Sequence, residues 1–332
     1  MGLEKRLVSL EKGFGQYSAN GFSNRTGRGR VDCGVVVVTY NSADHIEAAL
    51  TSLKAAAAGM TLRVVVVDNG SDDETLALVQ KNPDVICVEA RANLGYAGGI
   101  NVGRKVAGDY DALLVLNPDV ILAAGALREM FTALRYPGVG IVAPMLLDAD
   151  GRCFPSLRRE PTPMRAIGDG LLGRRLNWRP GCLSEIVWNH ADYLRPHAVD
   201  WATGAAWLIS SSCDRVVGRW DERFFLYSEE IDYAARARDA GFLIYYQPTA
   251  RVRHSEGGSG RSDVLVALHA VNRIRYMEKR GQWPRFFRAV VILHEALRYP
   301  KPSHRVALHA VMRRSSWQYI KMSLQSGGRP EK

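Results

Sequence analysis

The chain has 332 residues, of which 47% are hydrophobic and 23% charged, a balance that favours a packed globular protein. Its five cysteines are scattered, odd in number and without C-x-x-C spacing, which argues against a disulfide framework or a zinc site and fits a reducing compartment. The net charge of +10 predicts a negatively charged partner, for which nucleic acid, anionic lipid and a diphosphate are the candidates.

The N-terminal residues and the apolar runs bear on the compartment. The N-terminus lacks the apolar core of a signal peptide, and no uninterrupted apolar run approaches the roughly 18 residues that a membrane span needs. We therefore expect a cytoplasmic protein that is not exported. Peripheral attachment to the inner face of the plasma membrane is an open alternative.

Short β-branched runs mark the first strands. Residues 1–32 are polar and rich in Gly, Ser and Asn, and we expect a flexible N-terminal arm there. Buried strands are predicted at 35–38, 64–67, 85–88 and 113–116.

Helices are predicted between these strands from the spacing of apolar residues. Capping signals mark two of the helix starts, Asn41 with Asp44 and Ser71 with Glu74. The alternation of strand and helix predicts an α/β domain with a mostly parallel central sheet flanked by helices.

The pattern loosens beyond residue 150, and residues 151–198 suggest a substrate-specific insertion. The ordered elements expected after it are a strand at 201–209, a helix at 229–239, and short strands at 243–246 and 251–254. The last part, residues 261–332, predicts a basic helical region that is broken near Pro284 and Pro302.

Polar clusters follow three of the predicted strands. They are Thr39-Tyr40-Asn41, Asp68-Asn69 and Asn117-Pro118-Asp119. Because ligands bind at the carboxyl ends of parallel strands, these clusters predict one binding site. The chain has no P-loop, and no G-x-G-x-x-G follows the first strand, which disfavours an ordinary kinase or a dinucleotide-dependent dehydrogenase.

Seven motifs in order resemble one known family. The runs VVVVTYNS, VVVVDNGSDD, NLGYAGGIN, LLVLNPDV, DWATGAAWLI, RWDERFFLYSEEIDYAARARDAGF and RVRHSEGGS look like the family 2 glycosyltransferases with a GT-A fold, most of all the rhamnosyltransferase-type branch. The resemblance covers roughly residues 33 to 280. It implies a GT-A domain at 33–260, with a nucleotide-sugar-binding half at 33–150 and an acceptor half at 151–260.

The resemblance implies a donor pocket around Asp68, whose acceptor-only carboxylate suits the ring N–H of uracil or thymine. The glycine-rich run at 93–101 would bring backbone close to the diphosphate at a helix N-terminus. The donor-binding residues that it implies are Thr39, Tyr40, Asn41, Asp68, Asn93, Gly95, Asn101 and Asn117. On the residues alone, Asp68 could instead cap the neighbouring turn, and 93–101 could be a plain loop before a helix.

The metal site is implied by Asn117-Pro118-Asp119, which occupies the place of the family's D-x-D motif. That motif holds Mg²⁺ or Mn²⁺, which bridges the two donor phosphates. Asp119 is the implied metal ligand, and His254 completes the site or contacts the diphosphate. Asn117 replaces the first acid and leaves one fewer negative charge at the metal. Helix capping is the alternative for Asp119, and a structural role is the alternative for His254.

The catalytic base is implied by the run SEEID at 228–232, which aligns with the family's E-D motif. Glu230 takes the place of the family's aspartate, so Glu230 and Glu229 are joint candidates, with Glu230 slightly ahead. Asp232 is the third candidate, and its alternative is an i,i+4 pair with Arg236. A solvated acidic first turn that complements the helix dipole is the alternative for the whole run.

The acceptor wall is implied at Trp201, Thr203 and Gly204, where an aromatic face can cover a sugar ring; core packing is the alternative for Trp201. The basic C-terminal region suits an anionic membrane, at which a polyprenyl-diphosphate-linked acceptor would be reached. A solvated basic face is its alternative. No recognised motif supports nucleic acid as the partner.

The resemblance therefore implies a metal-dependent, inverting transfer of a sugar from a nucleotide diphosphate to a hydroxyl of a glycan or lipid-linked saccharide in cell-surface polysaccharide synthesis. The donor it favours is dTDP-L-rhamnose. The alternatives are a related transferase with a UDP-hexose donor, and a non-catalytic relative that binds sugar nucleotides or polysaccharide. The replacements at Asn117 and Glu230 are the features that favour the non-catalytic reading.

Overall fold

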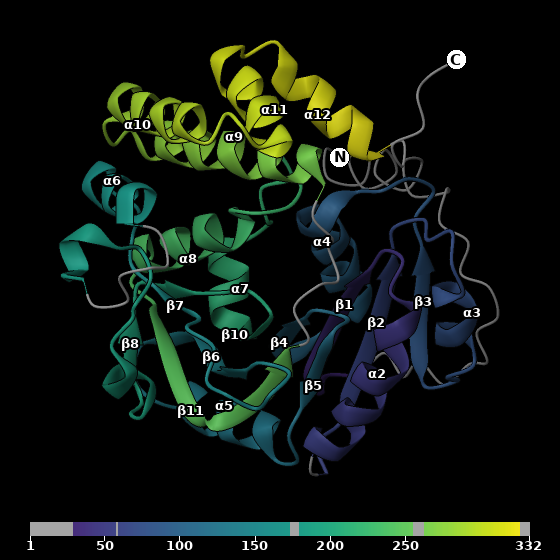
Figure 1. Ribbon diagram of the computed structural model, residues 1–332. Helices are drawn as coiled ribbons and strands as arrows, with labels where there is room; N and C mark the ends of the chain where they lie inside the picture. Colours follow the sequence, from purple (N-terminus) through teal and green to yellow (C-terminus); the bar gives the residue numbers. More distant parts are fainter. Residues whose placement is uncertain (1–28, 58, 173–178, 255–261, 326–332) are drawn as a thin grey trace, which may run out of the picture.

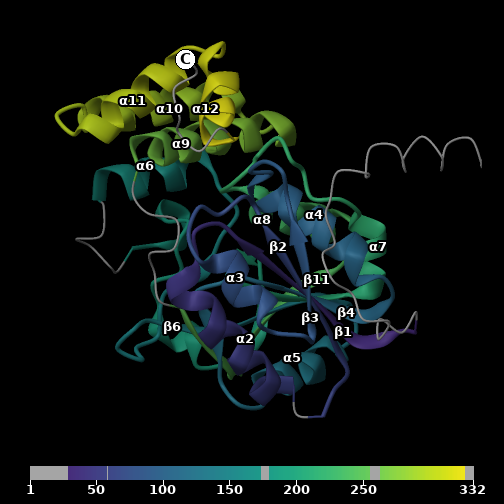
Figure 2. The same cartoon turned by 90° about the vertical axis from the view of Figure 1, so that its right-hand side faces the viewer.

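The computed structural model describes residues 29–57, 59–172, 179–254 and 262–325 (Figures 1 and 2). The predicted flexible arm at 1–32 falls almost wholly outside the described residues. The first strand begins at Val31, just ahead of the predicted start of the main domain.

Strands and helices alternate through the first half of the chain, as predicted. The elements are β1 (Val31–Thr39), α2 (Ala43–Ala57), β2 (Leu62–Asp68), α3 (Thr75–Gln80), β3 (Val85–Glu89), α4 (Gly95–Ala107), β4 (Tyr110–Leu116), β5 (Val120–Leu122), α5 (Ala126–Leu134) and β6 (Val139–Leu147).

The second half contains short strands and then a run of helices. The elements are β7 (Leu157–Arg158), α6 (Pro163–Leu172), two 3₁₀ turns (Gly181–Leu183 and His190–Tyr193), β8 (His197–Val199), β9 (Trp201–Ala202), β10 (Ala206–Ser210), α7 (Ser211–Val217), α8 (Glu229–Asp239), β11 (Leu243–His254), α9 (Asp263–Arg280), α10 (Pro284–Leu297), α11 (Pro302–Met312) and α12 (Ser316–Gln325).

One large sheet forms the centre of the molecule. Its strand order is β3-β2-β1-β4-β10-β6-β11-β5, and β8 pairs with β11. The pairs among β1, β2, β3 and β4, and the pair of β6 with β11, are parallel, whereas β10, β5 and β8 run antiparallel to their neighbours. The expected mostly parallel α/β sheet is therefore confirmed.

Helices cover both faces of this sheet, so its central strands are apolar on both sides (Figure 2). In β1, Val35 and Val37 belong to the hydrophobic cluster with α2 and α5. Val36 and Val38 alternate with them and belong to the cluster with α4 and α8.

Glycines let α4 lie close against β1. A Cβ atom at Gly103 would stand 2.4 Å from Cγ1 of Val36, and one at Gly99 would stand 2.6 Å from Cγ1 of Val38. Part of the glycine-rich run therefore serves helix–sheet packing, a role that we had not predicted for it.

The C-terminal helices form a layer above the sheet (Figure 1). Proline stands in the first turn of α10 and of α11, at the predicted breaks. Phe287 of α10 and Val311 of α11 share a hydrophobic cluster with Phe224 and with Ile231 of α8. The predicted helical tail is thus packed onto the part of the chain that carries the SEEID motif.

Some local predictions were wrong. The strand expected at 201–209 is two strands in different sheets, because β9 pairs with β7 whereas β10 joins the main sheet. Asn41 accepts a hydrogen bond from the Asp72 N–H and caps no helix. Ser71 donates to Asp68, and α3 has no side-chain cap at Glu74, so the expected capping box is absent from this helix.

Candidate active site

The carboxylate of Asp68 is buried at the carboxyl end of β2. Its two oxygens accept from the Thr39 hydroxyl at 3.0 Å, the Ser71 hydroxyl at 2.5 Å, and the backbone N–H groups of Gly70 at 3.2 Å and Ser71 at 2.9 Å. Protein donors thus fill its acceptor positions in this conformation. These contacts match the alternative in which Asp68 caps the neighbouring turn. Contact between Asp68 and a nucleobase stays a prediction.

Beside Asp68, hydrogen bonds join the loop after β1 to the loop after β2. The Asn41 N–H donates to the Ser71 hydroxyl at 2.9 Å, and the Asn41 side-chain oxygen accepts from the Asp72 N–H at 2.9 Å. Tyr40 is half-buried next to them. Thr39, Tyr40 and Asn41 therefore border one edge of the sheet together with Asp68, as the clustering of polar residues predicted.

Oxygen atoms of the protein accept hydrogen bonds from the first N–H groups of α4. Asn93 accepts from the Gly95 N–H at 2.9 Å, and the Phe225 carbonyl accepts from the N–H groups of Tyr96 at 2.6 Å and Ala97 at 3.4 Å. The helix N-terminus that was expected to face a diphosphate is thus capped by a carbonyl from a distant loop. Gly95 is needed there because it has φ +73° and because a Cβ would lie 2.4 Å from the Phe225 oxygen.

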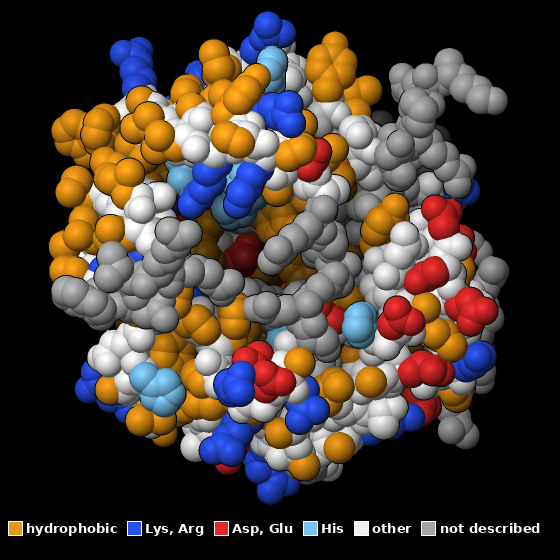
Figure 3. All heavy atoms as spheres, viewed as in Figure 1, with side chains coloured by type: hydrophobic (Ala, Val, Ile, Leu, Met, Phe, Trp, Pro, Cys, Tyr) orange, Lys and Arg blue, Asp and Glu red, His pale blue; other side chains and the backbone are white. Residues whose placement is uncertain are grey.

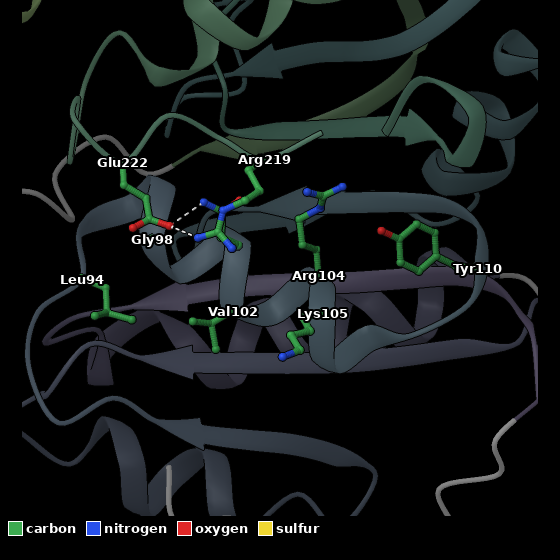
Figure 4. Close-up of a pocket in the computed structure, with 9 residues that line it drawn as sticks. Leu94, Gly98, Val102, Arg104, Lys105, Tyr110, Arg219 and Glu222 are labelled. Carbon is green, nitrogen blue, oxygen red and sulfur yellow. Dashed lines mark hydrogen bonds and ion pairs between the residues drawn. The ribbon is translucent and has the colours of Figure 1, made fainter. Parts of the chain in front are cut away.

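Asn101 of α4 holds the loop that follows α7. Its amide donates to the Trp220 carbonyl and to Glu222, and its oxygen accepts from the Trp220 N–H. It lines a separate cavity of about 400 Å³ on the outer side of α4, together with Arg104, Lys105 and Arg219 (Figure 4). The structure gives Asn101 a structural task, and we no longer propose it as a donor-binding residue.

Asp119 lies in the turn between β4 and β5, where it faces His254 at the end of β11. Pairing of Val120 with His254 brings them together, and the Asp119 Oδ1 lies 3.3 Å from the His254 Nε2. Burial raises the pKa of Asp119, but the hydrogen bond and charge of His254 outweigh it, so the net pKa is lowered; His45 adds to this effect. Asp119 is therefore a carboxylate under ordinary conditions.

The same turn touches the predicted acceptor wall. The Asn117 N–H donates to the Ala205 carbonyl at 2.9 Å, one residue after Gly204. Asn117 thus lies where the β4–β5 turn meets the start of β10.

The fit of a divalent metal can be judged from the donors present. Asp119 supplies hard oxygen, and the buried Nδ1 of His254 has no hydrogen-bond partner among the described residues. Within the described ranges no group of three or more His, Cys, Asp or Glu side chains could enclose a metal. A site with one or two protein ligands still fits Mg²⁺ or Mn²⁺, because such ions commonly take their remaining ligands from substrate phosphates and water.

Glu229 and Glu230 open α8, the first fully buried and the second half-buried. The Oε2 atom of each is buried and has no hydrogen-bond partner among the described residues. Burial raises the pKa of both, and for Glu229 the charge of Glu230 raises it further. A solvated acidic turn, the alternative interpretation of this run, does not match these two side chains.

Tyr96 connects the two groups of acids, and sequence reasoning had not selected it. Its hydroxyl donates to the Gly204 carbonyl at 3.4 Å. Burial raises the pKa of Tyr96 well above its usual value, and the charges of Glu229, Glu230 and Asp119 raise it further. The charges of all three acids therefore act on this one side chain.

Gly204 lies directly against Glu230. A Cβ at position 204 would stand 3.2 Å from the Glu230 Cβ. Nearby, Thr203 is fixed by two hydrogen bonds to the Ser156 carbonyl. The predicted acceptor turn is thus adjacent to the predicted base.

Arg158 on β7 is a second residue that sequence reasoning missed. Burial lowers the pKa of its guanidinium, while the charges of Tyr193, Glu185, Asp169 and Glu230 oppose this. Its charge in turn lowers the pKa of Glu230, partly offsetting burial. Only the fold reveals this neighbour, since an arginine in an irregular segment carries no sequence signal.

Asp232 is held in ion pairs within the protein. It pairs with Arg236 at 2.9 Å, the predicted i,i+4 alternative, and with Lys279 of α9 at 2.5 Å. Two cations hold its buried carboxylate in place, so we no longer propose it as a base.

Trp201 packs at the boundary between the cluster on the sheet and the cluster of the C-terminal helices. Its indole N–H donates to the Arg159 carbonyl at 3.0 Å. These contacts fit the core-packing alternative.

A hollow lies below the C-terminal helices, with an acidic side chain visible at its bottom (Figure 3).

Comparison with known proteins gives the family. The chain belongs to glycosyl transferase family 2, whose profile matches residues 34–182, and within it to the rhamnosyltransferase type. It is 34% identical to the N-acetylglucosaminyl-diphospho-decaprenol L-rhamnosyltransferase of Mycobacterium tuberculosis, over 75% of this chain and 85% of that protein. It is 30% identical to the low-salt glycan biosynthesis hexosyltransferase Agl10 of Haloferax volcanii, over 62% of each chain.

A solved structure agrees on the fold. The mannosyltransferase PcManGT from Pyrobaculum calidifontis, in complex with GDP-Man and Mn²⁺, matches with a TM-score of 0.52 at 16% identity, over 98% of this chain and 86% of that one. The predicted family and the GT-A fold are therefore confirmed.

Proposed function

We propose that this glycosyltransferase moves L-rhamnose from dTDP-L-rhamnose to a hydroxyl of a polyprenyl-diphosphate-linked saccharide, with inversion, during synthesis of a cell-surface polysaccharide. The named activity of the mycobacterial relative supports this donor sugar and this acceptor class. The hexosyltransferase relative supports a hexose as the second candidate for the transferred sugar, for which the donor would be a UDP-hexose.

The observation that carries the catalytic proposal is the carboxyl pair at the start of α8. Glu229 and Glu230 each keep a buried oxygen without a partner among the described residues, and Glu230 lies next to Gly204. Buried polar atoms without partners are expensive unless a ligand satisfies them. Substrate groups are the natural partners in this position.

Glu230 is the base in this proposal. The acceptor hydroxyl attacks the anomeric carbon from the face opposite the diphosphate, the bond from that carbon to the diphosphate oxygen breaks, and the hydroxyl proton passes to Glu230. The charge of Arg158 favours the ionised form of Glu230. Burial and the charge of Glu230 both disfavour ionisation of Glu229.

Asp119 and His254 would hold Mg²⁺ or Mn²⁺ in this proposal, with the remaining ligands supplied by the donor and water. The bound ion would neutralise negative charge that builds up on the departing diphosphate. Asn117, at the same turn, would contact the donor by its amide.

The donor pocket is proposed at the ends of β1 and β2. The nucleobase and ribose of the donor would be bordered by Thr39, Tyr40, Asn41 and Asp68. Asn93 and Gly95 would shape the adjoining loop. The acceptor enters beside Thr203 and Gly204. The domain boundaries at residues 33, 150 and 260 and the cytoplasmic location belong to the same proposal.

The test is turnover and binding of a panel of nucleotide sugars, with and without Mn²⁺ or Mg²⁺, by wild type, Asp119→Asn and Glu230→Gln. We expect metal-dependent transfer from one donor. Loss of a general base should lower the rate of Glu230→Gln roughly 100- to 10,000-fold with donor binding retained, whereas Asp119→Asn should lose the metal dependence of donor binding. Glu47→Gln, at an exposed position on α2, is the control.

Each alternative has its own outcome. Transfer that survives in Glu230→Gln and fails in Glu229→Gln would assign the base to Glu229. Turnover of a UDP-hexose in place of dTDP-L-rhamnose would replace the donor. Donor binding without transfer to any saccharide acceptor would favour the non-catalytic relative, and no binding of any nucleotide sugar would overturn the proposal.

A further inference from the structure

The outer side of α10 is apolar where a helix at the surface is normally polar. Phe286, Leu293 and Leu297 recur at helical spacing along it and are 52%, 58% and 62% exposed. The opposite side of the same helix is also apolar, and its Phe287 and Val291 are buried in the core of the helical layer. Packing inside the molecule therefore accounts for only one side of α10.

This apolar surface continues onto the neighbouring helices. Gly170 of α6 lies against His294 of α10, since a Cβ there would stand 3.0 Å from the His294 ring, and Leu171 at the end of α6 is 67% exposed. Hydrophobic side chains gather over α6 and α10 on the face of the molecule where the hollow opens (Figure 3). We call this surface the α10 face; its members are Met164, Leu171, Trp283, Phe286, Leu293, Leu297 and Tyr299.

The charged side chains at the surface of α10, α11 and α12, the helices around the α10 face, are positive. Between residues 281 and 325 the sequence has eight Lys and Arg residues and one acid, Glu295. Glu295 is buried and accepts from His294 at 3.0 Å and His304 at 2.6 Å, so its charge does not reach the surface. Arg285, in the first turn of α10, and Lys301, just before α11, are exposed and form no ion pair with any described residue.

Several other cations of the basic region serve the interior. Arg273 pairs with Glu185, Lys279 with Asp221 and Asp232, and Arg280 with Asp239. The basic residues of the C-terminal region therefore include two groups: those paired with acids of the protein, and those exposed at its surface. Arg285 and Lys301, beside the α10 face, take part in no such pair with a described residue and are exposed to an external partner.

Trp283 and Tyr299 flank α10 at its two ends and are 75% and 49% exposed. Aromatic residues with a polar atom favour the boundary between hydrocarbon and water. An apolar stripe between two such residues, bordered by cations, is the composition of a helix that lies in a membrane interface. Of the described helices, none has the length and apolar character to cross a bilayer.

We propose that the α10 face docks onto an anionic lipid bilayer, with α10 parallel to the membrane plane and Arg285 and Lys301 among the headgroups. The proposed function supplies the reason, because a polyprenyl-linked acceptor would reach the hollow from that surface. A second copy of the chain fits less well. A two-fold contact through this face would set one cationic rim against another.

The test is flotation of the full chain with vesicles of phosphatidylcholine, or of equal parts phosphatidylcholine and phosphatidylglycerol. We expect wild type to float with the mixed vesicles, and less so with phosphatidylcholine alone or at high salt. The triple variant Phe286→Ser, Leu293→Ser, Leu297→Ser should stay at the bottom. Its matched control is Tyr136→Ser, Leu194→Ser, Val216→Ser, at exposed apolar positions outside this face, which should float like wild type.

Charge reversal tests the rim separately. Each interfacial Lys or Arg contributes about a fivefold increase in binding to an anionic surface, so Arg285→Glu with Lys301→Glu should weaken binding by roughly 25-fold or more. The control reverses Arg135 and Arg251, which are exposed elsewhere. Circular dichroism and transfer to a water-soluble acceptor show whether each variant is folded.

Wild type that stays at the bottom with mixed vesicles would overturn the proposal, as would a triple variant that floats like wild type. A dimer in sedimentation velocity that the triple variant abolishes would instead assign the face to a second copy. Flotation needs no turnover, so a protein that floats as expected but transfers no sugar would refute the proposed function and leave the docking surface standing.

Discussion

At the scale of single residues, the catalytic proposal rests on two adjacent glutamates with different neighbours. Glu230 lies next to Gly204 and within the field of Arg158, whereas Glu229 is buried beside Glu230 and Tyr96. One ionised and one neutral carboxyl group can therefore coexist in the pair. Sequence alignment alone could not separate them, because their difference arises from residues on β7, α4 and the turn before β10.

The raised pKa of Glu229 predicts how stability depends on pH. Below the ordinary glutamate value of 4.5, Glu229 is protonated in both the folded and the unfolded chain. As pH rises above that value, the unfolded chain gains free energy by ionising while the buried side chain resists, and the folded state loses about 1.4 kcal/mol for each unit between the two pKa values. Glu229→Gln removes this loss.

We therefore expect Glu229→Gln to melt at a higher temperature than wild type at pH 8, with the difference shrinking toward pH 4. Thermal denaturation followed by circular dichroism, without donor or metal, measures it. Glu47→Gln, exposed on α2, should show no such trend. A difference in melting temperature that stays the same at both pH values would contradict ionisation as its cause.

At the scale of elements, the loop that leads into α8 is held in an unusual backbone conformation. Phe225, Tyr227 and Ser228 have φ values of 65°, 69° and 71°, which residues with a side chain rarely adopt. Asn272 of α9 is fully buried, and its amide donates to the carbonyls of Phe224 at 2.5 Å, Leu226 at 2.9 Å and Tyr227 at 3.0 Å. Asn272 is therefore a positioning residue for the two glutamates.

Asn272→Ala leaves these carbonyls without their hydrogen-bond donor. We therefore expect the loop before α8, and with it the first turn of α8, to become more mobile. The expected result is a fall in kcat of roughly ten- to a hundredfold, the range of a small misplacement of a catalytic group, with the donor KM nearly unchanged. Steady-state kinetics with varied donor measures both constants. Asn82→Ala is the control, since this side chain donates to the Leu78 carbonyl at the end of α3, far from α8 in the fold. Equal losses in the two variants would argue against positioning.

The elements themselves were largely predictable because their signals are local. The β-branched runs of β1 and β2 and the apolar spacing of α2 predicted strand and helix directly. The split between β9 and β10 was not predictable, since the Thr203-Gly204 turn differs little from its surroundings and only pairing with β7 and β4 reveals it. The cap on α4 comes from Phe225, a residue with no local connection to that helix.

The site was predictable in position but less so in contacts. Strand-end clusters correctly predicted that Thr39 and Asp68 would meet and that Asn117 and Asp119 would follow β4. Whether Glu229 is solvated or buried depends on how later helices pack, which no local pattern encodes. Tyr96 and Arg158 were missed for the same reason.

At the scale of the whole molecule, the C-terminal helices share a hydrophobic core with α8, the helix that carries the proposed base. Phe287, Val291 and Val311 pack in one hydrophobic cluster with Phe224 and with Ile231 of α8. The layer thus has two sides with different tasks. Its inner side supports the start of α8, and its outer side carries the α10 face proposed to meet the membrane.

This division predicts different results for two truncations. Deleting residues 281–332 removes Phe287, Val291 and Val311 and exposes the apolar side of α9. Loss of several buried side chains, each worth about 2–5 kcal/mol, should unfold the layer and abolish transfer along with membrane binding. Deleting only residues 316–332 removes α12, none of whose described side chains is fully buried, and should be tolerated.

Thermal denaturation, transfer to a water-soluble acceptor and flotation should be measured together on both truncations and on the Phe286→Ser, Leu293→Ser, Leu297→Ser variant. Only that triple variant should separate the two tasks, with transfer retained and flotation lost, because its side chains contact solvent and not the core. Full activity of the chain ending at residue 280 would show that α10 and α11 contribute nothing to the site. The C-terminal layer would then be a separate anchor, and its shared core with α8 would carry no catalytic consequence.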